Sequence, residues 1–184
     1  MPRVGLTPPI IAQAASTIVD RDGRSSLTLA RVAEQLGVRP PSLYNHVDGL
    51  DGLERLVALD GLERLVDECR GALVGRSGPD GLRSMARVYL SFARANPGVY
   101  PLTQVARPGD DDYQRRARRL LDDLLALLSG FGIPDDELIH AARAMRSALH
   151  GFAMLEVQEG FGLETDVDES FEWLLDSLER SLTR

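Results

Sequence analysis

Apolar residues recur at intervals of three and four along most of the chain, which is the spacing of helices with one buried face. The longest stripe runs through Leu138, Ala142, Met145, Leu149 and Phe152. No stretch of six residues alternates apolar and polar side chains with enrichment in β-branched residues, so strands are not expected. The pattern predicts an all-α protein of about nine helices.

Capping residues, prolines and glycines give the expected limits of these helices. Thr7 and Thr28 stand at N-cap positions, and Gly23 and Gly37 stand at helix ends. The first three helices are short and the next six include the longest. We therefore expect an N-terminal three-helix domain over residues 1–48 and a C-terminal helical domain over 49–184. The nine predicted helices cover residues 8–22, 29–36, 40–46, 51–73, 82–95, 99–105, 113–131, 134–158 and 169–182.

The predicted helix over 51–73 contains the heptapeptide Asp-Gly-Leu-Glu-Arg-Leu-Val twice, at 51–57 and 60–66. An offset of nine residues is about two and a half helical turns, so the two copies face opposite sides. A helix that is apolar on several sides packs between two bodies. Gly52 and Gly61 each weaken this helix by about 1 kcal/mol relative to alanine.

The composition is acidic and contains no lysine. The 184 residues include 21 basic residues, all arginine, against 28 Asp plus Glu, for a net charge of −7. This balance argues against a protein that coats nucleic acid by charge alone. Residues 1–50 differ from the rest, because they carry five arginines against four acidic residues. The acidity of the whole chain therefore does not exclude a small nucleic-acid-binding face within residues 1–50.

Other classes of protein fit the sequence poorly. The longest apolar runs are too short to cross a bilayer, so no membrane association is expected. The single cysteine, Cys69, cannot form an internal disulfide, which fits a reducing cytoplasm, and it is expected to be a core residue. Glu137 and His140 have the spacing of half a di-iron site, but the second Glu-x-x-His is missing. We expect no enzyme activity, no metal and no cofactor.

Residues 28–47 have the pattern of a helix-turn-helix. Gly37 suits the left-handed turn conformation, and Ala33 is small where two helices must cross closely. The apolar residues that would hold the two helices together are Leu29, Val32, Leu36, Val38 and Leu43. The remaining residues of this segment would face outward, and their types are unusual for a purely structural helix: Arg39, Pro40, Pro41, Ser42, Asn45 and His46.

These residues resemble the tetracycline-repressor (TetR) family of bacterial transcriptional regulators. The resemblance covers residues 7–56, and its characteristic positions are Thr28, Val32-Ala33, Gly37-Val38, Leu43-Tyr44 and His46. It implies an all-α homodimer that places residues 40–46 in the major groove of DNA. It also implies a variable C-terminal domain that binds a small-molecule effector.

The C-terminal half resembles a TetR subgroup that carries a Trp-His-Gly signature. The matching residues are His150-Gly151 and, upstream, the segment 96–100 with the sequence Asn-Pro-Gly-Val-Tyr. Leu149 stands where that subgroup often has tryptophan.

The TetR resemblance assigns roles to eight residues. Thr28, Tyr44 and His46 would bind phosphates. Base edges or the flanking backbone would be contacted by Arg39, Pro40, Pro41, Ser42 and Asn45. Arg39 fits a bidentate guanine contact and a phosphate contact equally well. The two prolines have no N–H to donate, so they offer apolar contact only, such as to a thymine methyl group.

Three positions leave alternatives open. Tyr44 is either a phosphate ligand or a core aromatic whose hydroxyl reaches the surface. His46 is either a phosphate ligand or a helix-capping residue. Leu50 stands where many TetR proteins have a phosphate-binding lysine, which puts one phosphate contact in doubt.

The C-terminal domain is expected to bind a mostly hydrophobic effector. Candidate ligand-binding residues, each of which also fits an ordinary core position, are Tyr89, Phe92, Tyr100, Met145, Leu149 and Phe152. By resemblance, the last two helices form the dimer interface, where Trp173 either anchors the partner or covers the core. His150 either orients a ligand or satisfies a buried carbonyl.

The function predicted from the sequence is that of a TetR-type repressor. It would bind a palindromic operator as a homodimer and release it when the effector binds, through tilting of the helix over 51–73. The alternative is a helical ligand-binding or adaptor protein whose helix-turn-helix has lost DNA binding. Leu50 and the net acidity favour this alternative.

Overall fold

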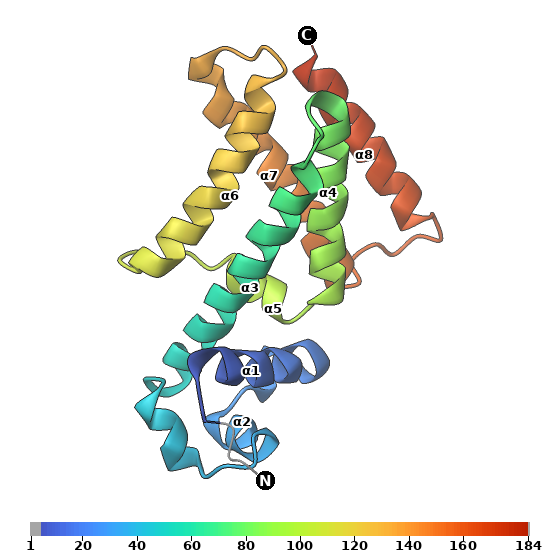
Figure 1. Cartoon of the computed structure of the whole chain (residues 1–184). Coiled ribbons are helices and arrows are strands. Elements are labelled where there is room, and N and C mark those ends of the chain that lie inside the picture. The colour runs from blue at the N-terminus through green and yellow to red at the C-terminus, as the bar shows by residue number, and fades with distance from the viewer. Residues whose placement is uncertain (1–4, 184) are drawn as a thin grey trace. The chain divides into compact units, whose positions relative to one another are not determined.

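The computed structural model describes residues 5–183, and every regular element in that range is a helix (Figure 1). The all-α prediction is confirmed, and each of the nine predicted helices has a counterpart. In chain order the elements are α1 (Pro8–Asp22), η1 (Arg24–Ser26), α2 (Leu29–Gln35), η2 (Pro40–Asn45), α3 (Gly49–Leu73), α4 (Gly78–Ala95), α5 (Val99–Thr103), α6 (Asp111–Ser129), α7 (Asp135–Val157) and α8 (Val167–Leu182).

Two of the differences from the sequence prediction have a physical reason in the prolines. The element over 40–46 is the 3-10 helix η2, in which Ser42 N–H donates to the Arg39 carbonyl at 2.9 Å. Pro40 and Pro41 in its first turn have no N–H, and 3-10 bonding is common in elements as short as these six residues. α4 begins at Gly78 rather than at 82, because Pro79 is suited to a first helical turn.

The helices form two compact units, neither of which is continuous in sequence. Unit 1 contains the chain up to Arg64 together with Asn96–Gln114, and unit 2 contains Leu65–Ala95 and the chain from Arg115 onward. α3 and α6 therefore each contribute one end to each unit. A functional boundary after residue 48 stays a prediction, because compactness groups segments by packing and not by role.

Aliphatic side chains from five elements make up the core of unit 1. Val32 and Leu43, which were predicted to hold the helix-turn-helix together, are fully buried, and Leu29, Leu36 and Val38 pack against them. The other large members of this core are Ile11, Ile18, Leu27, Leu53, Val57, Val99 and Leu102. Helices α1, α2, η2, α3 and α5 thus share one core.

In unit 2, α4 packs against both α7 and α8. Its apolar stripe is buried as predicted: Leu82, Met85, Tyr89 and Phe92. Arginines outside this stripe pair with acidic residues of the other two helices. Arg83 Nε donates to Glu179 Oε2 at 2.9 Å, and Arg94 Nε donates to Glu156 Oε1 at 2.8 Å. These pairs fasten α7 and α8 to α4.

Cys69 on α3 is fully buried, as expected of a core residue. Burial raises the pKa of its thiol to about 12, and the neighbouring carboxylates of Glu68 and Asp123 raise it further. The thiol is therefore protonated at neutral pH and unreactive. Among the helices in the described range, none is both long and apolar enough to cross a membrane.

Candidate nucleic-acid interface

Backbone and capping contacts hold the helix-turn-helix in the expected conformation. Thr28 has an extended backbone, and its Oγ1 accepts from Arg31 N–H at 3.2 Å, which caps α2. Gly37 adopts the left-handed conformation, with φ +65°, and Val38 N–H donates to the Ala33 carbonyl at 2.9 Å. The turn between α2 and η2 is thus fixed by the glycine and the small alanine that the sequence pointed to.

The predicted DNA-contacting side chains lie at the surface of unit 1. Seven are exposed and Ser42 is half-buried, and all except Thr28 lie on η2 or beside it. Tyr44 is 61% exposed, so the alternative that it is a core aromatic is wrong. His46 follows the last residue of η2, and its backbone N–H donates to the Leu43 carbonyl at 2.8 Å. Its capping contact uses the backbone, and the imidazole stays exposed.

The hydroxyl of Thr28 can still donate a hydrogen bond to a phosphate. It serves α2 as an acceptor for Arg31 N–H, and a threonine hydroxyl has one hydrogen left to donate. A phosphate oxygen beside the start of α2 could accept that hydrogen without breaking the cap. The two roles of Thr28 are therefore compatible.

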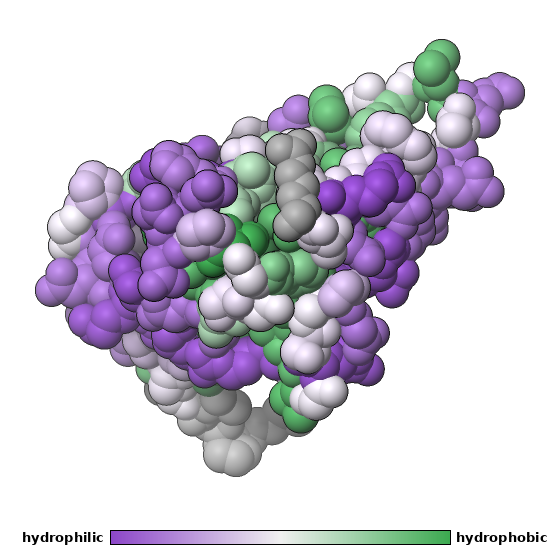
Figure 2. Space-filling model, turned by 90° about the horizontal axis from the view of Figure 1, so that it is seen from above, coloured by the Kyte–Doolittle hydropathy of each residue, from purple (hydrophilic) through white to green (hydrophobic). Residues whose placement is uncertain are grey.

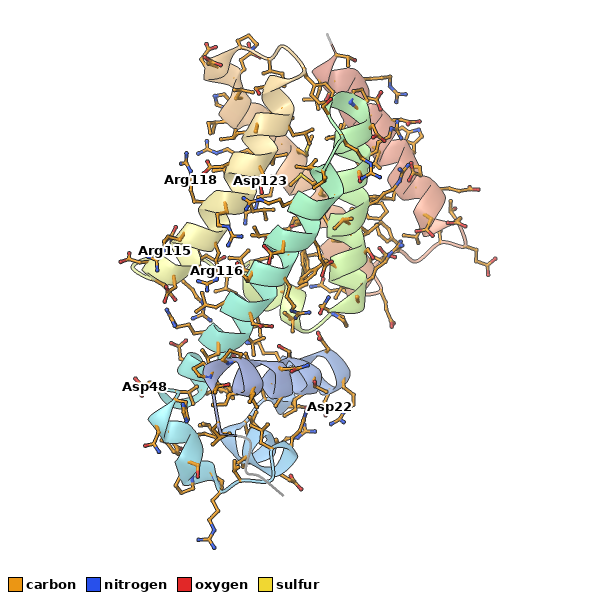
Figure 3. The ribbon with its side chains drawn as sticks, viewed as in Figure 1. Asp22, Asp48, Arg115, Arg116, Arg118 and Asp123 are labelled. Atoms are coloured by element: carbon orange, nitrogen blue, oxygen red, sulfur yellow. The ribbon has the colours of Figure 1, made fainter. Side chains whose placement is uncertain are left out.

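Most arginines near this surface are already paired. Asp22, labelled at the end of α1 in Figure 3, accepts from both Arg21 and Arg31. These two guanidinium groups lower the pKa of Asp22 to about 2. Arg24 makes a bidentate pair with the buried Glu54, at 2.7 and 2.8 Å.

Arg39 differs from these paired arginines. Among the four arginines described in residues 5–50, it alone makes no ion pair, and its side chain is exposed. Its full cationic charge is therefore available to a partner molecule.

The start of α3 departs from what the TetR resemblance suggests. Asp48, labelled in Figure 3, immediately precedes the helix, and its carbonyl accepts from Gly52 N–H at 3.0 Å. Leu50 is 46% exposed and offers an apolar side chain where a lysine would reach a phosphate. The backbone N–H groups of the first turn of α3 are the remaining donors there.

The predicted ligand-binding residues are divided between the two units. Tyr100 is fully buried on α5, in unit 1. Phe152 on α7 is half-buried, and its ring centroid lies 4.8 Å from that of Phe161 and 5.0 Å from that of Phe171. The other four are buried in unit 2, on α4 and α7: Tyr89, Phe92, Met145 and Leu149. Burial fits both a core role and a ligand role, so these assignments stay predictions.

His150 lies on α7 within unit 2. Burial lowers the pKa of its imidazole, and the cation of Arg146 lowers it further. The neutral form is therefore favoured at neutral pH.

Exposed apolar side chains gather along α7, α8 and the segment that joins them. Trp173 is 69% exposed and Leu163 is 83% exposed, so Trp173 does not cover the core. The others of this set are Ile139, Leu155 and Phe161. Figure 2 shows one face of the molecule, on which hydrophobic residues lie in separate groups among hydrophilic ones. Large apolar side chains that are exposed as a group mark an interaction surface.

The sequence interpretation missed three acidic residues that organise unit 1. Asp20 and Asp22 lie in the last turn of α1, where the helix dipole disfavours negative charge. Such a placement signals that a compensating partner lies nearby, and this signal was available in the sequence. Glu54, which is buried against Arg24, gave no comparable signal, because it lies in a heptapeptide whose second copy has an identical glutamate.

Comparison with known proteins gives a consistent result. Residues 82–178 match a family model described as the tetracyclin repressor-like C-terminal domain. The HTH-type transcriptional regulator YobS of Bacillus subtilis is 34% identical over 174 residues, which is 92% of this chain and 88% of YobS. The repressor DrrR1 of Streptomyces coeruleorubidus is 32% identical over 140 residues, 76% of this chain and 50% of DrrR1.

A solved structure shares the whole fold. SCO7222, a TetR regulator of Streptomyces coelicolor, superimposes with a TM-score of 0.78 at 20% identity, over 97% of this chain and 98% of its own. The all-α fold is therefore shared along almost the entire chain.

Proposed function

The chain belongs to the TetR family of HTH-type transcriptional regulators, and from this premise we propose that it is a repressor that binds a palindromic operator as a homodimer. A small, mostly hydrophobic effector would release it. The observation that carries the proposal is the exposed surface of residues 39–46, which stands on a helix-turn-helix whose apolar residues are buried. The repressor DrrR1 among the relatives supports this direction of regulation. The site of action would be the bacterial cytoplasm.

In this proposal each exposed side chain of the site has a distinct task. Arg39 reads a guanine or holds a phosphate, and a bidentate guanine contact contributes roughly 1–3 kcal/mol of discrimination. Asn45 fits an adenine edge, and Pro40 and Pro41 fit thymine methyl groups. Thr28, Tyr44 and His46 donate hydrogen bonds to phosphates and set the register.

Dimerisation would use α7, α8 and the segment between them. Exposed Trp173 and Leu163 would be covered by the same surface of a second copy, as isologous packing requires. Two copies of η2 would then enter successive major grooves, which lie about 34–36 Å apart. An effector bound among the apolar residues of unit 2 would change this separation and so weaken binding. The Trp-His-Gly subgroup of the C-terminal domain stays part of this proposal.

The proposal is tested by mobility-shift assays with the intergenic DNA beside the gene, over a salt series. We expect a specific complex whose affinity falls with salt, with a shallower slope than that of a strongly basic repressor. Arg39→Ala should weaken it at least about tenfold, which corresponds to 1.4 kcal/mol. Arg118→Ala removes the same charge from an exposed pair on α6 and should leave affinity unchanged.

One rival keeps specific support. Leu50 and Asp48 at the start of α3 favour an adaptor protein that has lost DNA binding. Binding of every DNA fragment with equal affinity, or of none, would establish the rival and reject the repressor.

A further inference from the structure

The short helix α5 lies between α1 and α3 within unit 1, and a glycine marks each contact. A Cβ atom on Gly98, just before α5, would lie 2.0 Å from the Val19 carbonyl oxygen of α1. A Cβ atom on Gly61 of α3 would lie 2.4 Å from Val99 Cγ1 of α5. Side chains at either glycine would push α5 away, so their absence permits this close packing.

Asp20 makes the polar part of the contact between α1 and α5. Its Oδ1 accepts from both Gly98 N–H and Val99 N–H, each at 2.9 Å. These are the first backbone donors of α5, which lack partners inside their own helix. The carboxylate of Asp20 is unfavourably placed at the end of α1, and the N-terminal end of α5 compensates it.

Further bonds hold both ends of the segment that contains α5. Arg64 Nη1 donates to Asn96 Oδ1 at 2.9 Å, just before the helix. Tyr113 Oη donates to the Thr103 carbonyl at 2.7 Å, at its other end. The Arg64 bond joins the start of this segment to α3, and the Tyr113 bond joins the end of α5 to the start of α6. Residues 96–114 thus belong to unit 1 together with the helix-turn-helix, although they are distant from it in sequence.

We propose that Asp20 couples α5 to operator binding: α5 capped by Asp20 fixes the C-terminal half of α1 in the operator-binding arrangement. This rests on the proposed function. α1, α2 and η2 share one core, so the position of α1 determines the position of residues 39–46. An effector that draws α5 away from Asp20 frees α1 and lowers operator affinity. Asp20 is a positioning residue, because it acts on DNA through α1.

The test measures operator affinity of the full chain by fluorescence anisotropy for Asp20→Ala and Asp20→Asn. The asparagine keeps an oxygen acceptor and loses the charge. Asp20→Ala should weaken operator binding about tenfold, because this is the typical effect of losing a capping side chain on an equilibrium that depends on the cap. Asp20→Asn should stay within about twofold of the wild type, on the same scale. Asp122→Ala on α6 removes an equal charge from an exposed pair and serves as the control.

Hydrogen exchange at Gly98 and Val99 is followed in the same proteins without DNA. It should become faster in Asp20→Ala and stay near the wild-type rate in Asp20→Asn. Where Asp20→Ala does not fold, Asp20→Glu replaces it, because it keeps the charge and displaces the oxygen. Its expected operator affinity is lower than that of Asp20→Asn.

Each alternative result overturns the proposal. Tighter DNA binding by both Asp20→Ala and Asp20→Asn would show that only the negative charge of Asp20 matters. Faster exchange at α5 with unchanged operator affinity would show a cap without coupling. Wild-type protein that binds no operator would reject the proposed function itself, and the exchange rates would then describe the cap alone.

Discussion

Replacement of Gly98 by alanine tests the packing of α5 directly. The added Cβ would lie 2.0 Å from Val19 O and 2.8 Å from Asp20 N, whereas real Cβ contacts stay above 3.0 Å. Both neighbours are backbone atoms of a helix and cannot rotate away as a side chain would. The start of α5 must therefore shift by about 1 Å or more relative to α1.

That shift gives the size of the effect. Forcing an extra methyl group into a packed contact costs about 1–3 kcal/mol. The two Asp20 hydrogen bonds, now 2.9 Å long, would stretch beyond normal hydrogen-bond length. Together we expect a loss of about 3 kcal/mol in the free energy of unfolding. For a chain of this length, this lowers Tm by about 6–12 °C.

Thermal unfolding followed by circular dichroism measures this change. Gly71→Ala is the matched control, because Gly71 is exposed within α3 and a Cβ there would meet no atom within 4 Å. Alanine should stabilise that position by about 0.5–1 kcal/mol. If Gly98→Ala unfolds at the same temperature as Gly71→Ala or above it, α5 does not pack on α1 as described.

Three further predictions concern the DNA-binding surface, the dimer surface and acid stability. If the proposed dimer forms, Trp173→Arg should be monomeric at micromolar concentration by analytical ultracentrifugation, whereas Trp173→Phe should be dimeric; a dimeric Trp173→Arg protein would contradict the proposed interface. Leu50→Lys should tighten operator binding and steepen the salt slope by about one unit, because it adds a phosphate contact, and Leu50→Gln should do neither. Arg21 and Arg31 lower the pKa of Asp22 from 3.8 to about 2. The stability from this cluster is therefore present above about pH 4 and lost as the pH falls toward 2. The Tm difference between wild type and Asp22→Asn should shrink over that range, and a difference independent of pH would contradict the pairing.

The local sequence was sufficient for the helices, because capping residues and apolar spacing act over a few residues. Thr28, Gly23 and Gly37 stand at helix ends as predicted, and Thr28 caps α2 with its side chain. Thr7 occupies the N-cap position of α1 but makes no side-chain capping bond. The 3-10 form of η2 was not predicted, although Pro40 and Pro41, which have no N–H, stand in its first turn.

Contacts distant in sequence were beyond the same reasoning. Gly61 seemed only to weaken its helix, yet its missing side chain admits Val99 from α5. Asp20 was not singled out in the sequence, yet it caps a helix that starts at Val99. Both partners become visible only when α5 is placed beside α1 and α3, so no analysis of spacing within one helix finds them.

The pairing of individual arginines decides how an acidic chain presents a cationic binding face. Arg24 forms an ion pair with Glu54, and Arg21 and Arg31 both pair with Asp22 near the helix-turn-helix. These pairs stabilise unit 1 and add little net attraction for DNA, because each guanidinium already faces a carboxylate. Arg39 stays unpaired within the described part of the chain and stands at the start of η2. A single unpaired arginine in residues 5–50 favours recognition by shape and hydrogen bonding over general charge attraction. The acidity of the chain as a whole is therefore compatible with specific DNA binding.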